Sequence, residues 1–351
     1  MSSVLAVAAN HIGLHNPRYH IIASQYKGST LKSIRRLLAA DWQTTSKSEL
    51  LSTLLMLCYA EISDQCRPEW LVHMHGANAI ARQPPVVQAT DSDAILSGFI
   101  APYFAAHNIL AYTAVADPAL EPRLVDGGRH WLSRIKRSHW EIDSSIGCSA
   151  ELLSIILDIT VRIRHLKRNP DLSTRTQARV WKNKTERLLR NLRQELPGNV
   201  ICDRPSSSYP DVSTVKIGAE AFRQGAVLFL QYLEEDSFHE AKIQHCVDTI
   251  LALMKQCPVK EHGGRSSVFW PFFLAGCHST KEGDRAYVLD RFRLLERPKR
   301  YGNTRPARKV IEHVWKQRDL GADEPCQQKC GSRCFEWEDA MVQLGSTISL
   351  T

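Results

Sequence analysis

Three cysteines near the C-terminal end come closest, among all residues of this sequence, to the pattern of a metal site. Cys326, Cys330 and Cys334 follow one another at intervals of four residues. On one helix these positions share roughly one face, and His313 is a possible fourth ligand. Structural zinc sites, however, usually combine two knuckles in which paired cysteines are two to four residues apart. We therefore expect no metal and no cofactor, and interpret the three cysteines as ordinary thiols in a loop.

Two further pairs suggest chemistry until helical geometry is considered. His73 and His75 lie two residues apart, so on a helix they point about 200° apart and cannot bind one ion together. Cys277 and His278 are adjacent, and neighbours on a helix diverge by about 100°. The imidazole is then out of reach as the base that a catalytic thiol needs. We interpret His73 as a packing residue and the Cys277–His278 pair as structural.

Two pairs of opposite charge lie in otherwise apolar helical segments. Glu220 and Arg223 are three residues apart, and Glu312 and Arg318 lie near the other end of the chain. One interpretation is a partly buried ion-pair network, which we favour. The sharper alternative is a pocket for a small anionic effector, because Arg binds anionic groups through two parallel hydrogen bonds.

The positive charge of the chain is concentrated in one segment. The net charge is +8, yet residues 162–193 alone hold eleven Lys or Arg residues against Asp171 and Glu186. Clustered cations can neutralise nucleic-acid phosphates or an acidic partner. We favour a solvated helix face, because the segment has no reader motif and its Trp181 falls on an apolar stripe with Leu188. The candidate basic surface consists of Arg179, Lys182, Lys184, Arg187, Arg190 and Arg193.

Composition excludes several classes of protein. A chain of 351 residues with 43% hydrophobic residues and eight Trp is long and apolar enough to bury a core,. The longest nearly apolar stretch, 268–277, contains Pro271 and is much shorter than the roughly 20 residues that span a bilayer,. We expect no membrane association. No phosphate-binding loop, dinucleotide fingerprint or nucleophile elbow is present in the sequence,, so we expect no enzyme.

The segments that must position these residues have helical periodicity almost throughout. No stretch alternates cleanly as a strand does. The sequence therefore predicts an all-α fold, a single irregular array of antiparallel helices. Helices are expected at 49–62, 68–82, 94–115, 149–166, 174–196, 213–235, 240–257, 265–279, 284–295 and 304–318. Loops are expected at 84–93, 117–128, 197–211 and 321–331.

A series of motifs in fixed order suggests a family. An apolar helix is followed by Trp70, His73 and Gly76, and further motifs occur downstream in the chain. The full set of positions is Trp70, His73, Gly76, Glu220, Arg223, Trp270, Pro271, Gly276, Trp315, Arg318 and Asp319. In their shared order these motifs resemble the fungal-specific transcription factor domain, the regulatory region of zinc-cluster activators. The resemblance extends over residues 19–345, which we expect to form the domain after an N-terminal tail, 1–18, with a possible sub-division at 197–211.

This resemblance implies a helical regulatory domain of the nucleus, or of the nucleus and cytoplasm, without chemistry of its own. It would control a metabolic or biosynthetic gene set by contacting transcription machinery or a zinc-cluster factor, and a small-molecule effector could modulate it. Members usually carry six cysteines in C-x2-C-x6-C pairs, and this sequence has no such array. We therefore expect no specific DNA binding by this chain alone. A fragment, a mis-predicted gene and a stand-alone regulatory domain all remain compatible with that departure.

Two other hypotheses stand beside this one. The first is a helical enzyme of secondary metabolism, for which His73, Glu220 and His278 would have to converge on one cavity. The second is a co-regulator that dimerises with a full-length zinc-cluster factor, which a large exposed apolar patch would favour.

Overall fold

The computed structural model describes residues 1–13, 16–39, 47–83, 96–115, 117–143, 145–196, 212–233, 239–257, 268–296, 302–321 and 335–351. Across these ranges the regular structure is helical, and the only β-type pairings are two isolated bridges, Glu141–Glu195 and Ile142–Ser149. The all-α prediction is confirmed.

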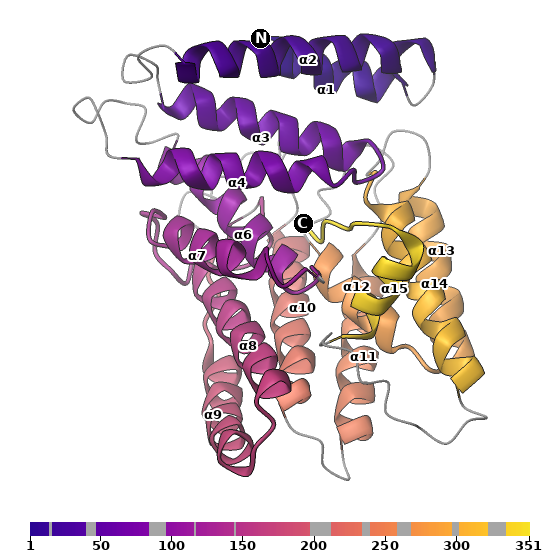
Figure 1. Ribbon diagram of the computed structural model, residues 1–351. Helices are drawn as coiled ribbons and strands as arrows, with labels where there is room; N and C mark the ends of the chain where they lie inside the picture. Colours follow the sequence, from indigo (N-terminus) through magenta and orange to yellow (C-terminus); the bar gives the residue numbers. More distant parts are fainter. Residues whose placement is uncertain are drawn as a thin grey trace.

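The first four long helices stack at one end of the molecule, the top of Figure 1. α1 (Ser2–Gly13) packs along α2 (Arg18–Ala39), and α3 (Lys47–Ser63) packs along α4 (Glu69–Arg82). α1 also contacts α3 and so joins the two pairs. Small side chains on the inner face of α1 permit this close packing, among them Ala6 and Ala9,.

The remaining helices lie below this stack, and the longest of them run across its direction at a steep angle in Figure 1. A π-helical turn η2 (Leu96–Ile100), α6 (Ala101–Tyr112) and α7 (Glu121–Leu132) lie directly beneath the stack. The chain continues through α8 (Ala150–Arg168), α9 (Leu172–Asn191), α10 (Val212–Leu230), η4 (Gln231–Leu233), α11 (His239–Gln256), α12 (Phe269–His278), α13 (Glu282–Leu295), α14 (Thr304–Gly321) and α15 (Glu336–Leu344).

The core is centred on α12 and on buried aromatic residues. Every residue of α12 is buried, and α12 contacts α10, α11 and α14. Phe335 stacks on Trp337 with ring centroids 4.6 Å apart, and Phe229 packs against both rings. Burying side chains of this size supplies most of the stabilisation that apolar contacts give.

The structure corrects two expectations about where helices occur. The range 1–18, expected to be a tail, contains α1, which packs on α2 and α3. Most of the range 117–128, expected to be a loop, belongs to α7. The long helix expected at 94–115 begins instead as the π-helical turn η2, and Pro102 occupies the first turn of α6, where a missing N–H costs little,.

α9 buries only part of the stripe that its apolar residues predicted. Its buried positions are Ala178, Lys182, Thr185 and Leu189, whereas Leu188 is 50% exposed. Lys182, counted with the basic surface, is only 3% exposed. Trp181 does pack against the core, with the Arg162 guanidinium 4.6 Å from its ring centroid. The buried face thus combines the small residues Ala178 and Thr185 with Lys182 and Leu189, and it leaves Leu188 exposed.

Some expectations fall outside the described residues. These are the loops at 84–93 and 197–211, with the possible sub-division at the latter, the start of the helix expected at 265, and the loop at 321–331 apart from its first residue. Among the residues that are described, no helix combines the length and the apolar character needed to cross a membrane.

Candidate effector pocket

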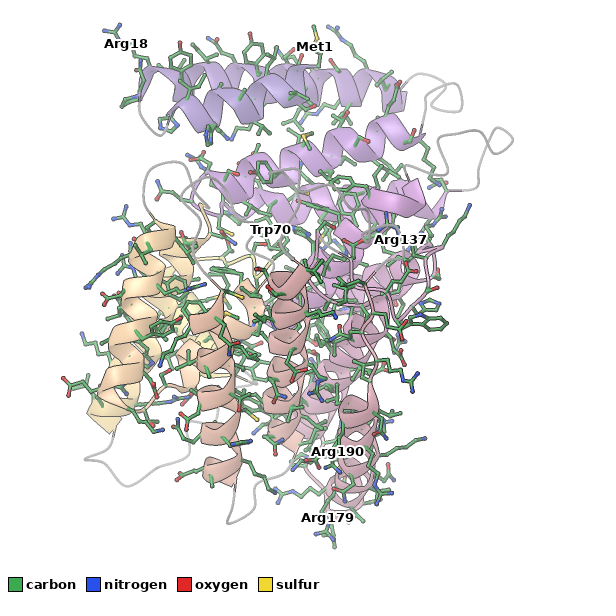
Figure 2. The ribbon with its side chains drawn as sticks, turned by 180° about the vertical axis from the view of Figure 1, so that it is seen from behind. Met1, Arg18, Trp70, Arg137, Arg179 and Arg190 are labelled. Atoms are coloured by element: carbon green, nitrogen blue, oxygen red, sulfur yellow. The ribbon has the colours of Figure 1, made fainter. Side chains whose placement is uncertain are left out.

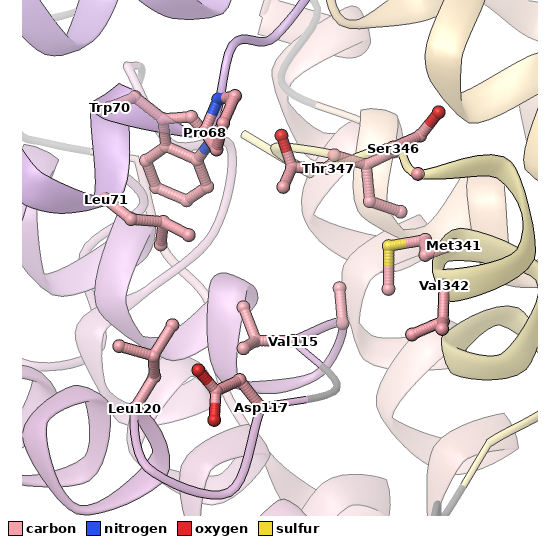
Figure 3. Close-up of a pocket in the computed structure, with 13 residues that line it drawn as sticks. Pro68, Trp70, Leu71, Val115, Asp117, Leu120, Met341, Val342, Ser346 and Thr347 are labelled. Atoms are coloured by element: carbon pink, nitrogen blue, oxygen red, sulfur yellow. The ribbon is translucent and has the colours of Figure 1, made fainter.

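A cavity of about 470 Å³ lies where three distant parts of the chain meet. One wall is the start of α4, the second is the connection from α6 to α7, and the third is α15 with the residues that follow it (Figure 3). The lining residues are Pro68, Trp70, Leu71, Ala114, Val115, Asp117, Leu120, Met341, Val342, Gly345, Ser346, Thr347 and Ile348. A volume of this size suits a small organic molecule.

The walls are mostly apolar, with a few polar groups at opposite edges of the cavity (Figure 3). Trp70, Leu71 and Leu120 lie together on the wall opposite Met341 in Figure 3. The Asp117 carboxylate lies at the lower edge of the cavity in Figure 3 and accepts a hydrogen bond from the Ala119 backbone N–H at 2.9 Å. A few polar groups in an apolar cavity are typical of ligand sites, because they fix the orientation of the ligand.

A buried arginine connects the helix ends that form two walls of the cavity. Arg164 of α8 is 2% exposed. Its guanidinium donates to the carbonyl oxygens of Tyr112 and Val115, at 2.9 and 3.0 Å. It also pairs with Glu121 at 3.0 Å and with Glu338 at 2.5 Å. One cation therefore holds the end of α6, the start of α7 and the start of α15 in place.

α15 is attached through the same network. Glu338 is fully buried, and its second carboxylate oxygen accepts the Phe335 backbone N–H, which closes the N-terminal turn of the helix,. Trp337 donates to the Thr113 carbonyl at 3.0 Å, and Trp270 of α12 donates to the Thr113 hydroxyl at 3.0 Å. The third wall thus depends on buried polar contacts as well as on apolar packing.

The segment after α15, residues 346–351, lines the cavity with its first residues and reaches three other elements; we call it the strap. Thr347 donates to the Cys66 carbonyl at 2.6 Å in the turn between α3 and α4. Asn303, at the start of α14, donates to the Ser349 carbonyl at 2.8 Å. Thr351 hydrogen-bonds His107 of α6 at 2.6 Å. Burial of Ile348 and Leu350 adds apolar contacts,.

The turn that the strap contacts is strained. Gln65 and Cys66 have φ angles of 58° and 54°, a left-handed conformation that costs side-chain-bearing residues roughly 1 kcal/mol or more,. The Cys66 thiol is buried, which raises its pKa to about 12,. The Thr347 hydrogen bond helps to hold this turn beside the cavity.

Of the motif residues named from the sequence, the cavity contains Trp70 alone. Several others form a joint between helices at the end of α12. Trp315 donates to the Gly276 carbonyl at 2.8 Å, and Arg318 donates to the Cys277 carbonyl at 2.6 Å. These bonds satisfy carbonyls that a helix end leaves open. Arg318 also pairs with Glu336 of α15, and Asp319 pairs with Arg285 of α13 at 2.8 Å.

The other motif positions near the N-terminal side lie within the helix stack. His73 is buried, and its Nε2 lies 3.8 Å from Glu61. Burial opposes ionisation of Glu61, but the contacts with His73 and Lys27 outweigh it and lower the pKa of this carboxyl,. Gly76 faces Leu54 at an ordinary contact distance. These residues pack α3 against α4, which is the role inferred for His73.

Glu220 and Arg223 form a local, partly buried ion pair at 2.6 Å. Arg223 also donates to the Leu189 carbonyl at 3.1 Å and so links α10 to α9. Glu312 pairs with Arg308 instead of Arg318. Glu220 and Arg223 therefore form an ion pair as predicted, whereas Glu312 and Arg318 each pair with another residue. In the described part of the chain these are separate local pairs and not one network.

The residues named for the enzyme hypothesis do not meet. His73 faces Glu61, Glu220 faces Arg223, and His278 hydrogen-bonds Tyr232 at 2.8 Å. None of the three lines a described cavity. Burial raises the pKa of the neighbouring Cys277 thiol well above its ordinary value, so this thiol is not activated,.

The remaining candidates are the basic surface and the cysteine set. Arg179 and Arg190 project from the part of the molecule that lies away from the helix stack (Figure 2). Lys184, Arg187 and Arg193 are exposed as well. Cys326, Cys330 and Cys334 lie outside the described residues. Within the described ranges, no cluster of His, Cys, Asp or Glu is arranged to hold a metal ion.

The residues that hold the cavity walls together could hardly be predicted from sequence patterns. Arg164 counted as one of many basic residues, although its position one turn after the buried Thr160 on the apolar stripe of α8 marks it as inward-facing,. Glu121 and Glu338 occupy first turns of helices. Acidic residues are common there because they interact favourably with the helix dipole. Their convergence follows only from the tertiary fold.

Comparison with known proteins gives one match. The model of a family described as the fungal specific transcription factor domain matches residues 1–351. No curated protein and no solved structure matches the chain.

Proposed function

The chain belongs to the family of the fungal specific transcription factor domain, and from this premise we propose that it is a regulatory domain controlled by a small effector in the cavity between α4, α7 and α15. Membership supports a role as a transcription regulator. The effector, the target genes and the partners belong to the proposal.

The observation that carries the proposal is the construction of the cavity. Its three walls come from residues 68–71, 114–120 and 341–348, so a ligand would contact elements that are otherwise joined by the Arg164 network and the strap. A ligand shifts a protein between states only through contacts that differ between them. Filling this cavity would change how α15 and the strap sit against α4 and α6, and would thereby alter the outer surface that a partner meets.

The lining indicates the chemistry of the effector. Trp70, Leu71, Leu120 and Met341 favour an apolar body, and the volume of about 470 Å³ sets its size,. Asp117 favours a hydroxyl or a cationic group at one edge of the cavity, and Ser346 and Thr347 line the opposite edge,. We propose a small, largely apolar molecule with a single hydrogen-bond donor or positive charge.

The wider setting follows from the family. We propose that the domain acts in the nucleus, or in the nucleus and cytoplasm, through contact with transcription machinery or with a zinc-cluster factor. Sequence-specific DNA binding is not expected of this chain alone. A specific footprint on duplex DNA at nanomolar protein would contradict that expectation.

A neutral apolar dye tests the cavity without knowledge of the natural effector. Nile red should bind the purified chain saturably, with one site and enhanced fluorescence. Val342→Trp places a large side chain at the cavity wall and should weaken dye binding at least tenfold. The matched control is Val180→Trp on α9, an exposed position away from the cavity, which should leave the affinity unchanged. Equal affinity in both variants would show that the dye, and by extension the effector, does not use this cavity.

A further inference from the structure

The outer side of α1 carries an apolar stripe that no described residue covers. Its inward positions are buried against α2 and α3. The exposed positions are Met1, Val4, Leu5, Ala8, His11 and Ile12, and all of them except His11 are apolar. An unpartnered stripe of this kind on a helix at the edge of the molecule is a candidate contact surface,.

The neighbouring helix α2 adds positive charge without any acidic residue. Residues 1–39 contain no Asp and no Glu. Lys27 turns inward and pairs with Glu61 at 3.0 Å. The other four cations of α2 are exposed and have no ion pair with a described residue: Arg18, Lys32, Arg35 and Arg36. Figure 2 shows Met1 and Arg18 projecting from the outer edge of the molecule.

The combination of an apolar stripe with unneutralised cations restricts what can bind. A second copy would bring like charges together, which opposes association. Duplex DNA would use the cations but leave the apolar stripe in water. Amphipathic helices that lie on membranes carry their cations and their apolar face on the same helix, whereas α1 has the apolar stripe without any Lys or Arg and the exposed cations are on α2. An acidic segment with regularly spaced apolar residues would use both features at once.

We propose that the outer side of the α1–α2 hairpin is a docking surface for an acidic, amphipathic helical segment of a partner protein. The apolar side chains of that segment pack on the α1 stripe, and its carboxylates face the cations of α2. α2 has 22 residues and is about 33 Å long,, which accommodates a helix of about 20 residues. The surface shares no residue with the cavity, so the two proposals succeed or fail separately.

The test uses a fluorescein-labelled model peptide of about 20 residues with Leu at every third or fourth position and Glu at the others. Fluorescence anisotropy should show saturable binding that weakens as salt rises. A peptide with Lys in place of Glu should not bind. The double variant Leu5→Ser/Ile12→Ser should raise Kd at least tenfold, and so should Arg35→Glu/Arg36→Glu. The matched control, Arg187→Glu/Arg190→Glu on α9, changes the charge by the same amount and should leave Kd unchanged.

Several results would overturn the proposal. These are failure of the intact chain to bind the acidic peptide, equal binding of the basic peptide, and an equal loss of affinity in the α9 control. A dimer that light scattering detects and Leu5→Ser/Ile12→Ser dissociates would assign the stripe to a second copy. Sedimentation with anionic lipid vesicles that requires the same residues would assign it to a membrane. Circular dichroism confirms folding, and if the apolar variant unfolds, the Arg35/Arg36 variant decides alone.

Discussion

At the residue scale, a few buried polar side chains determine how the cavity is built and how it responds to pH. His107 is held between the Tyr103 carbonyl, which accepts from its Nδ1 at 2.9 Å, and the Thr351 hydroxyl at its Nε2. Burial lowers the pKa of His107 to about 4, although the hydrogen bond to Tyr103 acts in the opposite direction. The side chain is therefore neutral in the folded protein at pH 7.

This shift predicts acid sensitivity with a definite sign. The pKa of an unfolded His is about 6.5. Between pH 6.5 and pH 4 this side chain is therefore protonated in the unfolded chain but not in the folded one, and the free energy of unfolding falls as the pH is lowered. Lowering the pH from 7 to 5 should cost about 2 kcal/mol through His107. His107→Gln keeps a neutral polar side chain but cannot titrate. Urea unfolding at both pH values should show a smaller loss for this variant by about that amount, and an identical loss would contradict the assignment.

At the scale of elements, the start of α15 depends on one buried carboxylate. Glu338 accepts from Arg164 and from the Phe335 backbone N–H. Glu338→Ala would leave the buried Arg164 with one carboxylate fewer, and should lower the free energy of unfolding by about 3 kcal/mol. Glu151→Ala, at an exposed first-turn position of α8, is the matched control and should cost less than about 1 kcal/mol. Denaturant unfolding measures both, and similar losses would contradict the role of the Arg164 network.

The helices that the sequence predicted well are those with a clear apolar period or a clear cap. α8 is an example, since Ser149 accepts the Leu152 N–H and an apolar stripe follows,. α7 was missed because it contains Gly127 and Gly128, which usually indicate a turn. The structure explains both: a Cβ on Gly127 would lie 2.4 Å from Asn108, and one on Gly128 would lie 2.8 Å from Ile109. Close packing of α7 on α6 requires glycine, and a single sequence does not reveal such a contact.

At the scale of the whole molecule, the contacts between the helix stack and the remaining helices include one very tight backbone contact. A Cβ on Gly302 would lie 2.1 Å from the Ser63 carbonyl oxygen, at the end of α3. The neighbouring Asn303 ties the strap to the same place. The cavity lies between the helix stack and the helices below it. Its three walls come from distant parts of the chain, so they could not be predicted from any local pattern in the sequence.

Replacing glycine by alanine should have different effects at the junction and at an open position. Gly302→Ala forces α14 and α3 apart and should lower the free energy of unfolding by roughly 1–3 kcal/mol. Gly283→Ala lies in the first turn of α13 with no neighbour within 4 Å of the added Cβ, and should be neutral or stabilise by up to about 1 kcal/mol. Thermal unfolding of both variants provides the comparison. An equal effect would show that the Ser63 contact does not constrain the junction.

The strap also has a consequence for the synthesis of the protein on the ribosome. Thr347 bonds Cys66 across 281 residues of sequence, and Thr351 bonds His107 across 244. At about 5–20 residues per second, roughly 15–60 s separate the synthesis of the α3–α4 turn from that of its partner. During that interval the nascent chain holds Trp70 and Leu71 without the strap that lines the same cavity. Chaperone attachment to the growing chain should therefore begin once α4 emerges and end only when the strap has been made.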